Sequence, residues 1–384
     1  MDFEQCSMTD IETELLRYTF ASRNNDRNHG HDGNEHLHIT TSGQEGPVEN
    51  NCAFQQYSFY PFVHLSVIEL SARDFASLEP AKALQLPGQP HLEKFVKQYF
   101  RFIHPFLPVI DEGHFWQIYL GDKSQDASFS LFVLQAMLFA TAGTVKHETI
   151  SSLGFKNHVD ARNSFYSRAK LLVDLHVETD PYCIAQGALL LSHQYSLTDQ
   201  HVNNVWLGGA IEYSKACNAD HYDDPNAEVT ENSRRKRLWW SCVIRDRILA
   251  LGVRQPIFIT PEKFDFDQEG LVPADLESEL KTTMVYPPGY KSTPIFWAIE
   301  ICHLAKLMTP AMIVVEKVKS LQMIEDYKKP LNLCRILQLL LQVHAKLDEW
   351  ESSLSKADSK FPEGPSSGHS QVVMMHKNLI YIYW

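Results

Sequence analysis

The spacing of apolar residues is the feature that most constrains this chain. Phe95, Tyr99 and Phe102 follow one another at intervals of four and three positions, and apolar residues at such intervals form one face of an amphipathic helix. Two longer stripes with the same spacing occupy the last third of the sequence. They are Trp297, Ile301, Ala305, Met308, Met312 and Val315, and then Leu333, Leu337, Leu340, Val343, Leu347 and Trp350. We therefore predict an all-α, multi-helix fold.

Local signals place the ends of two further helices. Asp180 before Pro181 is typical of an N-cap followed by a first-turn proline, so a helix is expected to begin there. Thr230 is expected to cap the helix that carries the apolar residues of 238–251. Gly252 follows that run and is expected to end the helix, because glycine favours the left-handed conformation found there.

The first part of the chain has a different composition. Residues 21–51 hold only four apolar side chains among Asn, His, Gly, Asp and Ser, too few to offset the entropy of ordering, so disorder is predicted. Residues 79–90 carry prolines and a glycine and are predicted to be a linker. We expect residues 1–85 to form a mostly disordered arm and linker in front of the helical body.

Charge and cysteine content limit the possible functions. The formal net charge is −12, whereas a surface that grips nucleic-acid phosphates is basic, so contact with DNA would need a separate basic module. The seven cysteines are scattered without a C-x-x-C pair, a pattern typical of reduced thiols. We predict no bound metal and no cofactor.

Membrane association is not expected. The N-terminus, M-D-F-E, is acidic and lacks the basic and then apolar start of a signal peptide. The most apolar stretch, residues 129–145, is interrupted by Ser130, Gln135 and Thr141. It is therefore predicted to be a core helix.

Two enzyme signatures match in amino-acid sequence but lack the structural context that each requires. Residues 364–368 read G-P-S-S-G, but a serine nucleophile elbow needs a strand before it and a helix after it, and these residues lie in a polar loop. Asp223 and Asp224 resemble the paired carboxylates that hold magnesium in helical terpene cyclases, but Pro225 follows at once and favours a turn. We predict no catalytic residue, and a helical magnesium-dependent enzyme is kept only as the second alternative.

Residues 234–237, R-R-K-R, are the only local basic run. They fit a solvated helix start paired with the acidic residues of 223–231, a nuclear-import patch, or a phosphate contact. Trp239 and Trp240 follow closely and would bury a large apolar area. That burial favours the structural interpretation over an import signal.

Two sequence motifs go beyond generic helices. Residues 99–111 read Y-F-R-F-I-H-P-F-L-P-V-I-D, and residues 234–247 read R-R-K-R-L-W-W-S-C-V-I-R-D-R; W-L-G-G-A-I lies between them at 206–211. This order resembles the fungal-specific transcription factor domain, the middle homology region of fungal zinc-cluster (Zn2Cys6) regulators, and is nearest to the cutinase-activator-like subgroup. The resemblance covers about residues 92–268.

The resemblance carries twelve motif positions, to which we assign structural rather than catalytic roles. They are Phe102, His104, Pro105, Pro108, Asp111, Trp206, Trp239, Trp240, Arg245, Asp246, Arg247 and Gly252. It also implies that residues 86–275 form the middle homology domain and that residues 276–384 form a C-terminal helical part, which we expect to be incomplete.

Geometry adds four expectations for these positions. Pro105 disfavours helical backbone at the residue before it, so a helix is expected to end at His104, a capping or turn histidine. Phe102, Pro105 and Pro108 should turn the chain back across the core. Trp239 and Trp240 should be buried. Arg245 and Asp246 are neighbours on a helix and point to different faces, so each should pair with another helix.

The function implied by the resemblance is that of a non-catalytic domain of a fungal transcriptional regulator in the nucleus. Such regulators often control a metabolic or biosynthetic gene set. They usually read DNA through six cysteines that hold two zinc ions, but only Cys6 and Cys52 precede Cys183 here. We expect a chain without its own zinc cluster, either truncated or dependent on other transcription factors or co-regulators, with homo- or heterodimers possible. No DNA-contacting residue can be assigned. The alternative is a helical protein-interaction scaffold without a transcriptional role.

Overall fold

The computed structural model describes residues 53–66, 71–121, 128–195, 201–287, 289–321 and 330–358. The predicted disorder of residues 21–51 lies outside these ranges, as does the G-P-S-S-G stretch at 364–368. Within them the all-α prediction is confirmed, because helices account for most residues and the strands are two or three residues long.

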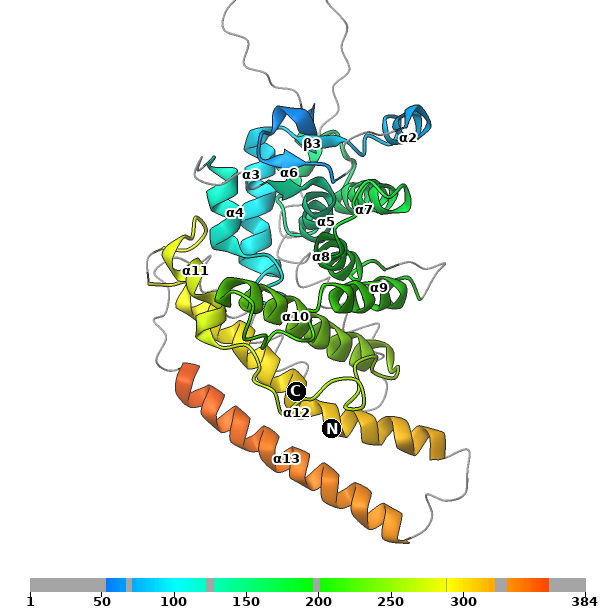
Figure 1. The fold of residues 1–384 in the computed structure, drawn as a ribbon, viewed down its shortest axis with the longest axis vertical. Coiled ribbons are helices and arrows are strands. Elements are labelled where there is room, and N and C mark those ends of the chain that lie inside the picture. The colour runs from blue at the N-terminus through cyan, green and yellow to red at the C-terminus, as the bar shows by residue number, and fades with distance from the viewer. Residues whose placement is uncertain are drawn as a thin grey trace, which may run out of the picture.

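A stack of helices forms the centre of the body (Figure 1). Every residue of α5 (Leu131–Thr141) is buried, and this helix packs against α3 (Gln89–Gln98), α7 (His158–Asp174) and α8 (Pro181–Leu191). α8 also packs against α9 (Val202–Ala216). The core-helix prediction for residues 129–145 is confirmed.

The longer helices extend the stack at one end (Figure 1). α10 (Val229–Val253) packs on α8, α9 and α12 (Ser292–Leu321), and α12 packs on α13 (Pro330–Asp358). Shorter elements fill the periphery. They are α2 (Ala72–Leu78), α4 (Glu112–Tyr119), α6 (His147–Ser152), α11 (Glu277–Lys281) and the 3-10 turns η1 (Tyr57–Phe59) and η3 (Pro273–Leu276).

Two short strand pairs hold the N-terminal part of the described chain to the helices. β1 (Phe54–Gln56) pairs antiparallel with β3 (Gln85–Pro87), and β2 (Val63–His64) pairs parallel with β4 (Phe129–Ser130). The linker prediction for residues 79–90 is therefore wrong. The amide of Gln135 in α5 donates to the carbonyls of Ala83 and Gln85, at 3.0 and 2.8 Å, and thereby fixes β3 against the core.

The predicted helix ends are right at α8 and wrong at α10. The Asp180 carboxylate accepts from the backbone N–H groups of the first turn of α8. α10 begins one residue before Thr230, and Thr230 does not cap it. At the other end the helix runs past Gly252 to Val253, and Arg254 at φ 55° makes the left-handed turn. This turn leads directly into a loop that Asp246 holds, as described below.

The last two helices confirm both apolar stripes only in part, because Val315, the last residue of the first stripe, is 50% exposed. Trp297 in α12 and Val343 and Trp350 in α13 are buried, but Leu333 and Leu337 are half exposed. The stretch Ser292–Glu316 of α12 is long and apolar enough to cross a membrane. This helix packs against α10 and α13.

Candidate functional site

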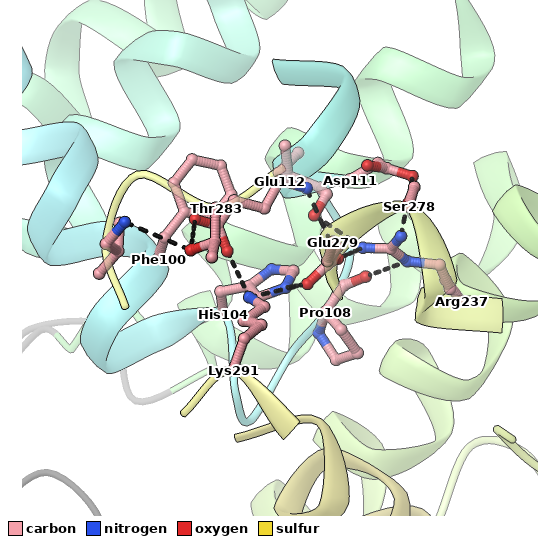
Figure 2. A network of polar contacts seen from close by, with 12 residues as sticks. Phe100, His104, Pro108, Asp111, Glu112, Arg237, Ser278, Glu279, Thr283 and Lys291 are labelled. Atoms are coloured by element: carbon pink, nitrogen blue, oxygen red, sulfur yellow. Dashed lines mark hydrogen bonds and ion pairs between the residues drawn. The ribbon is translucent and has the colours of Figure 1, made fainter. Parts of the chain in front are cut away.

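A buried carboxylate, Glu279 of α11, is the centre of the most extensive polar network in the described part of the chain (Figure 2). It contacts three side chains on three other segments, and the Glu112 N–H lies 3.5 Å from its Oε1. Arg237 of α10 forms an ion pair with one oxygen, and Lys291 and His104 reach the other at 2.9 and 2.8 Å. The side chains of all four residues are at most 3% exposed.

Arg237 uses its guanidinium on three further acceptors. Its Nε donates to the Pro108 carbonyl at 2.9 Å, and Nη2 donates to the Ile110 carbonyl at 2.8 Å. Nη1 pairs with Asp111 Oδ2 at 3.1 Å. The fixed fork of an arginine suits this multiple recognition, which a lysine could not reproduce. α10 is thereby joined to the whole segment 108–111.

A second carboxylate, Glu112, lies at the start of α4 and is fully buried. It forms an ion pair with Lys291, and it accepts from Thr283 Oγ1 at 2.9 Å and from Trp116 Nε1 at 3.1 Å. Lys291 therefore bridges Glu112 and Glu279, which belong to different helices. The neighbouring Asp111 caps α4 through the His114 N–H and also accepts from Ser278 Oγ.

Burial and charge act against each other in this network. Burial would raise the pKa of Glu279, but the hydrogen bond with His104 and the charges of Lys291 and Arg237 hold its pKa well below the usual range. Burial lowers the pKa of His104 despite the attraction of Glu279. Burial also opposes the charge on Lys291, yet Glu279 and Glu112 raise its pKa. The network thus places the Glu279 carboxylate between two cations, Arg237 and Lys291, and in contact with His104 Nε2.

The arrangement suits a structural clamp. The space beside His104, Glu279 and Lys291 is about 10 Å³, and a cavity of that size holds one water at most. A substrate therefore has no room next to these groups. What the network does is hold the first sequence motif against the second, because His104, Pro108 and Asp111 come from residues 99–111 and Arg237 comes from residues 234–247.

The sequence comparison agrees with this pairing of motifs. A profile of the fungal-specific transcription factor domain matches residues 96–352, more than half of the chain. This chain belongs to that family. The matched range includes both motifs and every residue of the Glu279 network.

Several fungal transcription factors are similar to this chain. Cutinase transcription factor 1 beta of Fusarium vanettenii is 31% identical over 55% of the chain. Fusaric acid cluster transcription factor FUB12 of Gibberella moniliformis is 28% identical over 46% of it, and transcription factor cpaR of Aspergillus oryzae is 28% identical over 58%. The chain spans 24%, 26% and 36% of the lengths of these relatives. No solved structure matches it.

The first family motif forms the turn that was expected. α3 continues as a π-helical turn, η2 (Tyr99–Ile103), and His104 lies at its end with its N–H bonded to the Tyr99 carbonyl. Phe102 is half buried, and Pro105 and Pro108 are buried in the bend that follows. His104 is thus a turn histidine as predicted. Its hydrogen-bond partner Glu279, 175 residues away, was not predicted.

The second family motif places both tryptophans in the core. Trp239 and Trp240 are 0% exposed, which confirms their predicted burial, and both rings pack edge-on against Phe264. Trp240 Nε1 donates to the Tyr222 hydroxyl at 3.1 Å. Trp206 of α9 is half buried and donates to the Tyr166 hydroxyl at 3.0 Å.

In the R-D-R part of this motif, the predicted pairing with another helix is right for one residue and wrong for another. Arg245 donates to the side chain and carbonyl of Ser192 at the end of α8, so its predicted pairing with another helix is confirmed. The same prediction for Asp246 is wrong. Its carboxylate pairs with the adjacent Arg247 at 2.5 Å and accepts from the N–H groups of Phe258 and Ile259, at 2.9 Å each.

This geometry explains the error at Asp246. Arg247 also donates to the Ile259 carbonyl at 2.9 Å and to Thr309 Oγ1 in α12. Asp246 and Arg247 therefore converge on one loop, and the loop supplies backbone N–H donors that no side-chain pattern reveals.

The basic run 234–237 divides into two halves. Arg234 and Arg235 pair with Glu231 one turn earlier, as expected for a solvated helix start. The same expectation is wrong for Lys236 and Arg237, which are buried. Lys236 pairs with Asp275 and with Glu269. Only the first two arginines remain available on the surface.

The carboxylate pair considered for magnesium lies in a turn. Asp224 Oδ1 accepts from the N–H of Asn226, and Asp224 Oδ2 is 4.0 Å from Arg235. Within the described ranges, three His, Cys, Asp or Glu side chains nowhere gather at a spacing that would hold a metal ion. The prediction of no cofactor and no metal stays a prediction.

Proposed function

We propose that this chain is the non-catalytic regulatory domain of a fungal transcriptional regulator that controls a metabolic or biosynthetic gene set. The observation that carries the proposal is the family match over residues 96–352. Relatives are named for cutinase and for a fusaric acid cluster, which supports a metabolic target set. Such a regulator acts in the nucleus.

DNA recognition is proposed to come from elsewhere. The formal net charge of −12 disfavours a phosphate-binding surface, and half of the single basic run is buried in ion pairs. A zinc cluster on a longer form of the protein, or a partner transcription factor, would supply the DNA contacts. Homo- or heterodimerisation is part of this proposal.

A tethering experiment tests the regulatory role. The chain is fused to a borrowed DNA-binding domain in a fungal host, with a reporter downstream of the matching sites. We expect the reporter output to change at least about threefold relative to the DNA-binding domain alone. An Arg237→Met fusion, which removes the central cation of the network, should lose the effect, whereas Arg234→Met should keep it.

Two outcomes would contradict the proposal. One is an unchanged reporter with several fusion geometries at equal protein level. The other is exclusion of the tagged chain from the nucleus together with unaltered transcripts in a deletion strain. The second result would favour the scaffold alternative instead.

A further inference from the structure

A cavity of about 230 Å³ opens between α9, α10 and the loop after α10. Ile211 of α9, Trp239 of α10 and Ile259 of the loop line it, and each of these side chains is at most 4% exposed. Phe258, more than a third exposed, lines it as well. The cavity shares no lining residue with the Glu279 network.

The cavity wall is rigid on the side of the loop. Asp246 accepts from the N–H groups of Phe258 and Ile259, and Arg247 donates to the Ile259 carbonyl. Both charged residues are buried in α10. The two apolar loop residues are therefore held in place by buried side chains of α10, and the cavity is pre-formed, as small-molecule sites usually are.

One polar group in the wall lacks a partner. Within the described part of the chain, Trp239 Nε1 is buried and makes no hydrogen bond, whereas the neighbouring Trp240 donates to Tyr222. A buried N–H without an acceptor is unfavourable and is normally satisfied by the protein, by water or by a ligand.

The polar side of the cavity is cationic. Lys215 and Lys263 line it together with a single carboxylate, Glu212. Glu212 lies 3.2 Å from Lys215 with its side chain 74% exposed, so this ion pair is weak and a competing anion can displace it. Lys263 donates to the Phe258 carbonyl, which leaves two of its three donors for a ligand.

We propose that this cavity binds a small amphipathic carboxylate. Its apolar body, an aromatic ring or a short alkyl chain, would lie against Ile211, Trp239 and Ile259, and its carboxylate would bind Lys215 and Lys263. The volume exceeds that of a cavity of about 150 Å³ that takes up benzene. The proposal concerns binding alone, so its test does not depend on the transcriptional role.

Binding is tested on the full chain with defined probes. 4-Propylbenzoate and octanoate are titrated by calorimetry, with 4-propylbenzamide and octanamide as neutral counterparts. We expect the dissociation constants of the acids to be about fivefold or more below those of the amides. In protein labelled with ¹⁵N-tryptophan, the indole N–H signal that Trp239→Phe removes should shift on titration.

A matched pair of glycines locates the site. Gly208 lines the cavity and Gly209 does not, yet a Cβ on either meets nothing within 4 Å. Gly208→Leu should therefore fill the cavity and abolish binding, while Gly209→Leu should leave it within about twofold of the parent protein. Lys263→Gln should weaken the acids about threefold or more and leave the amides unchanged.

The proposal is overturned if no probe binds at millimolar concentration. It is equally overturned if acids and amides bind alike, or if Gly208→Leu and Gly209→Leu behave the same. A Cβ at either glycine meets nothing within 4 Å, and a comparison of the melting temperatures of both leucine variants with that of the parent protein checks that each is folded.

Discussion

Arg237 and Asp111 are 126 residues apart in the sequence, and their side chains are 3.1 Å apart in the fold. The contact joins the C-terminal residue of the first family motif to a residue in the basic run of the second. The same guanidinium also pairs with the buried Glu279. A pair of motifs that looks like two separate signatures in the sequence is thus one structural unit.

Loss of Arg237 should therefore destabilise the whole domain. Arg237→Met would leave Glu279 buried with less positive charge around it, and breaking a buried ion pair costs about 3–5 kcal/mol of unfolding free energy. Urea denaturation followed by circular dichroism measures the effect.

Arg234→Met is the control for this variant. Arg234 is on the same helix, but it is half exposed, and in the described part of the chain its side chain pairs with Glu231 and with the face of Tyr182. Its loss should cost about 1 kcal/mol or less. Adding Glu279→Gln to Arg237→Met should recover part of the stability, since the unpaired charge is gone. Strict additivity of the two substitutions would argue against the clamp.

The sequence predicted the parts of this unit that follow from local pattern. Helix periodicity and two adjacent tryptophans are enough to place Trp239 and Trp240 in the core, and Pro105 is enough to end a helix at His104. The partners of the buried charges could not be predicted. Glu279 lies in a short charged segment, E-S-E-L-K, whose composition is that of a solvated helix, and only the tertiary fold buries it.

The errors have the same origin. Arg234 and Arg237 look alike in the sequence and lie about one turn apart on α10. Only Arg237 lies where residues 108–111 and Glu279 cover the helix. Asp246 was expected to face a neighbouring helix but accepts from backbone N–H groups of a loop. Loop backbone leaves no periodic signal, so neither this contact nor the cavity beside it could be found from the residues alone.

Stability should fall in mild acid because of His193. Burial and the positive charges of Arg245 and Arg162 hold the pKa of His193 well below its usual range. The unfolded chain therefore takes up a proton below about pH 6.5 that the folded chain does not. Unfolding free energy should decrease below that pH, with a slope of up to about 1.4 kcal/mol per pH unit from this residue.

His193→Gln separates this contribution from those of other groups. The glutamine keeps a hydrogen-bond donor near the Leu190 carbonyl, which His193 Nδ1 contacts at 3.1 Å, but it does not titrate. Chemical denaturation at pH 7, 6 and 5 should give a shallower dependence for the variant. Identical pH dependence in both proteins would mean that His193 takes up a proton in the folded state.

Substitution by alanine should lower the stability at Gly187 and raise it at Gly209. A Cβ at Gly187 in α8 would lie 2.1 Å from the ring of Phe132 in α5, and Phe132 is itself buried. Gly187→Ala should destabilise by about 1–3 kcal/mol despite the better helix propensity of alanine. Gly209→Ala meets open space and should stabilise by about 0.5–1 kcal/mol. Thermal denaturation of the two variants would refute the packing of α5 against α8 if both became more stable.

Replacing each of the two core tryptophans with phenylalanine should measure the contribution of the one hydrogen bond that, among the described residues, Trp240 makes and Trp239 does not. Trp240 Nε1 donates to the Tyr222 hydroxyl, whereas Trp239 Nε1 makes no hydrogen bond in the described part of the chain. Both rings are fully buried, so the loss of packing is similar and only Trp240→Phe also removes a bond. We expect Trp240→Phe to cost about 1 kcal/mol more in unfolding free energy than Trp239→Phe. Equal costs in urea denaturation would mean that Trp239 is already hydrogen-bonded in solution, and a water in the cavity would then be the acceptor.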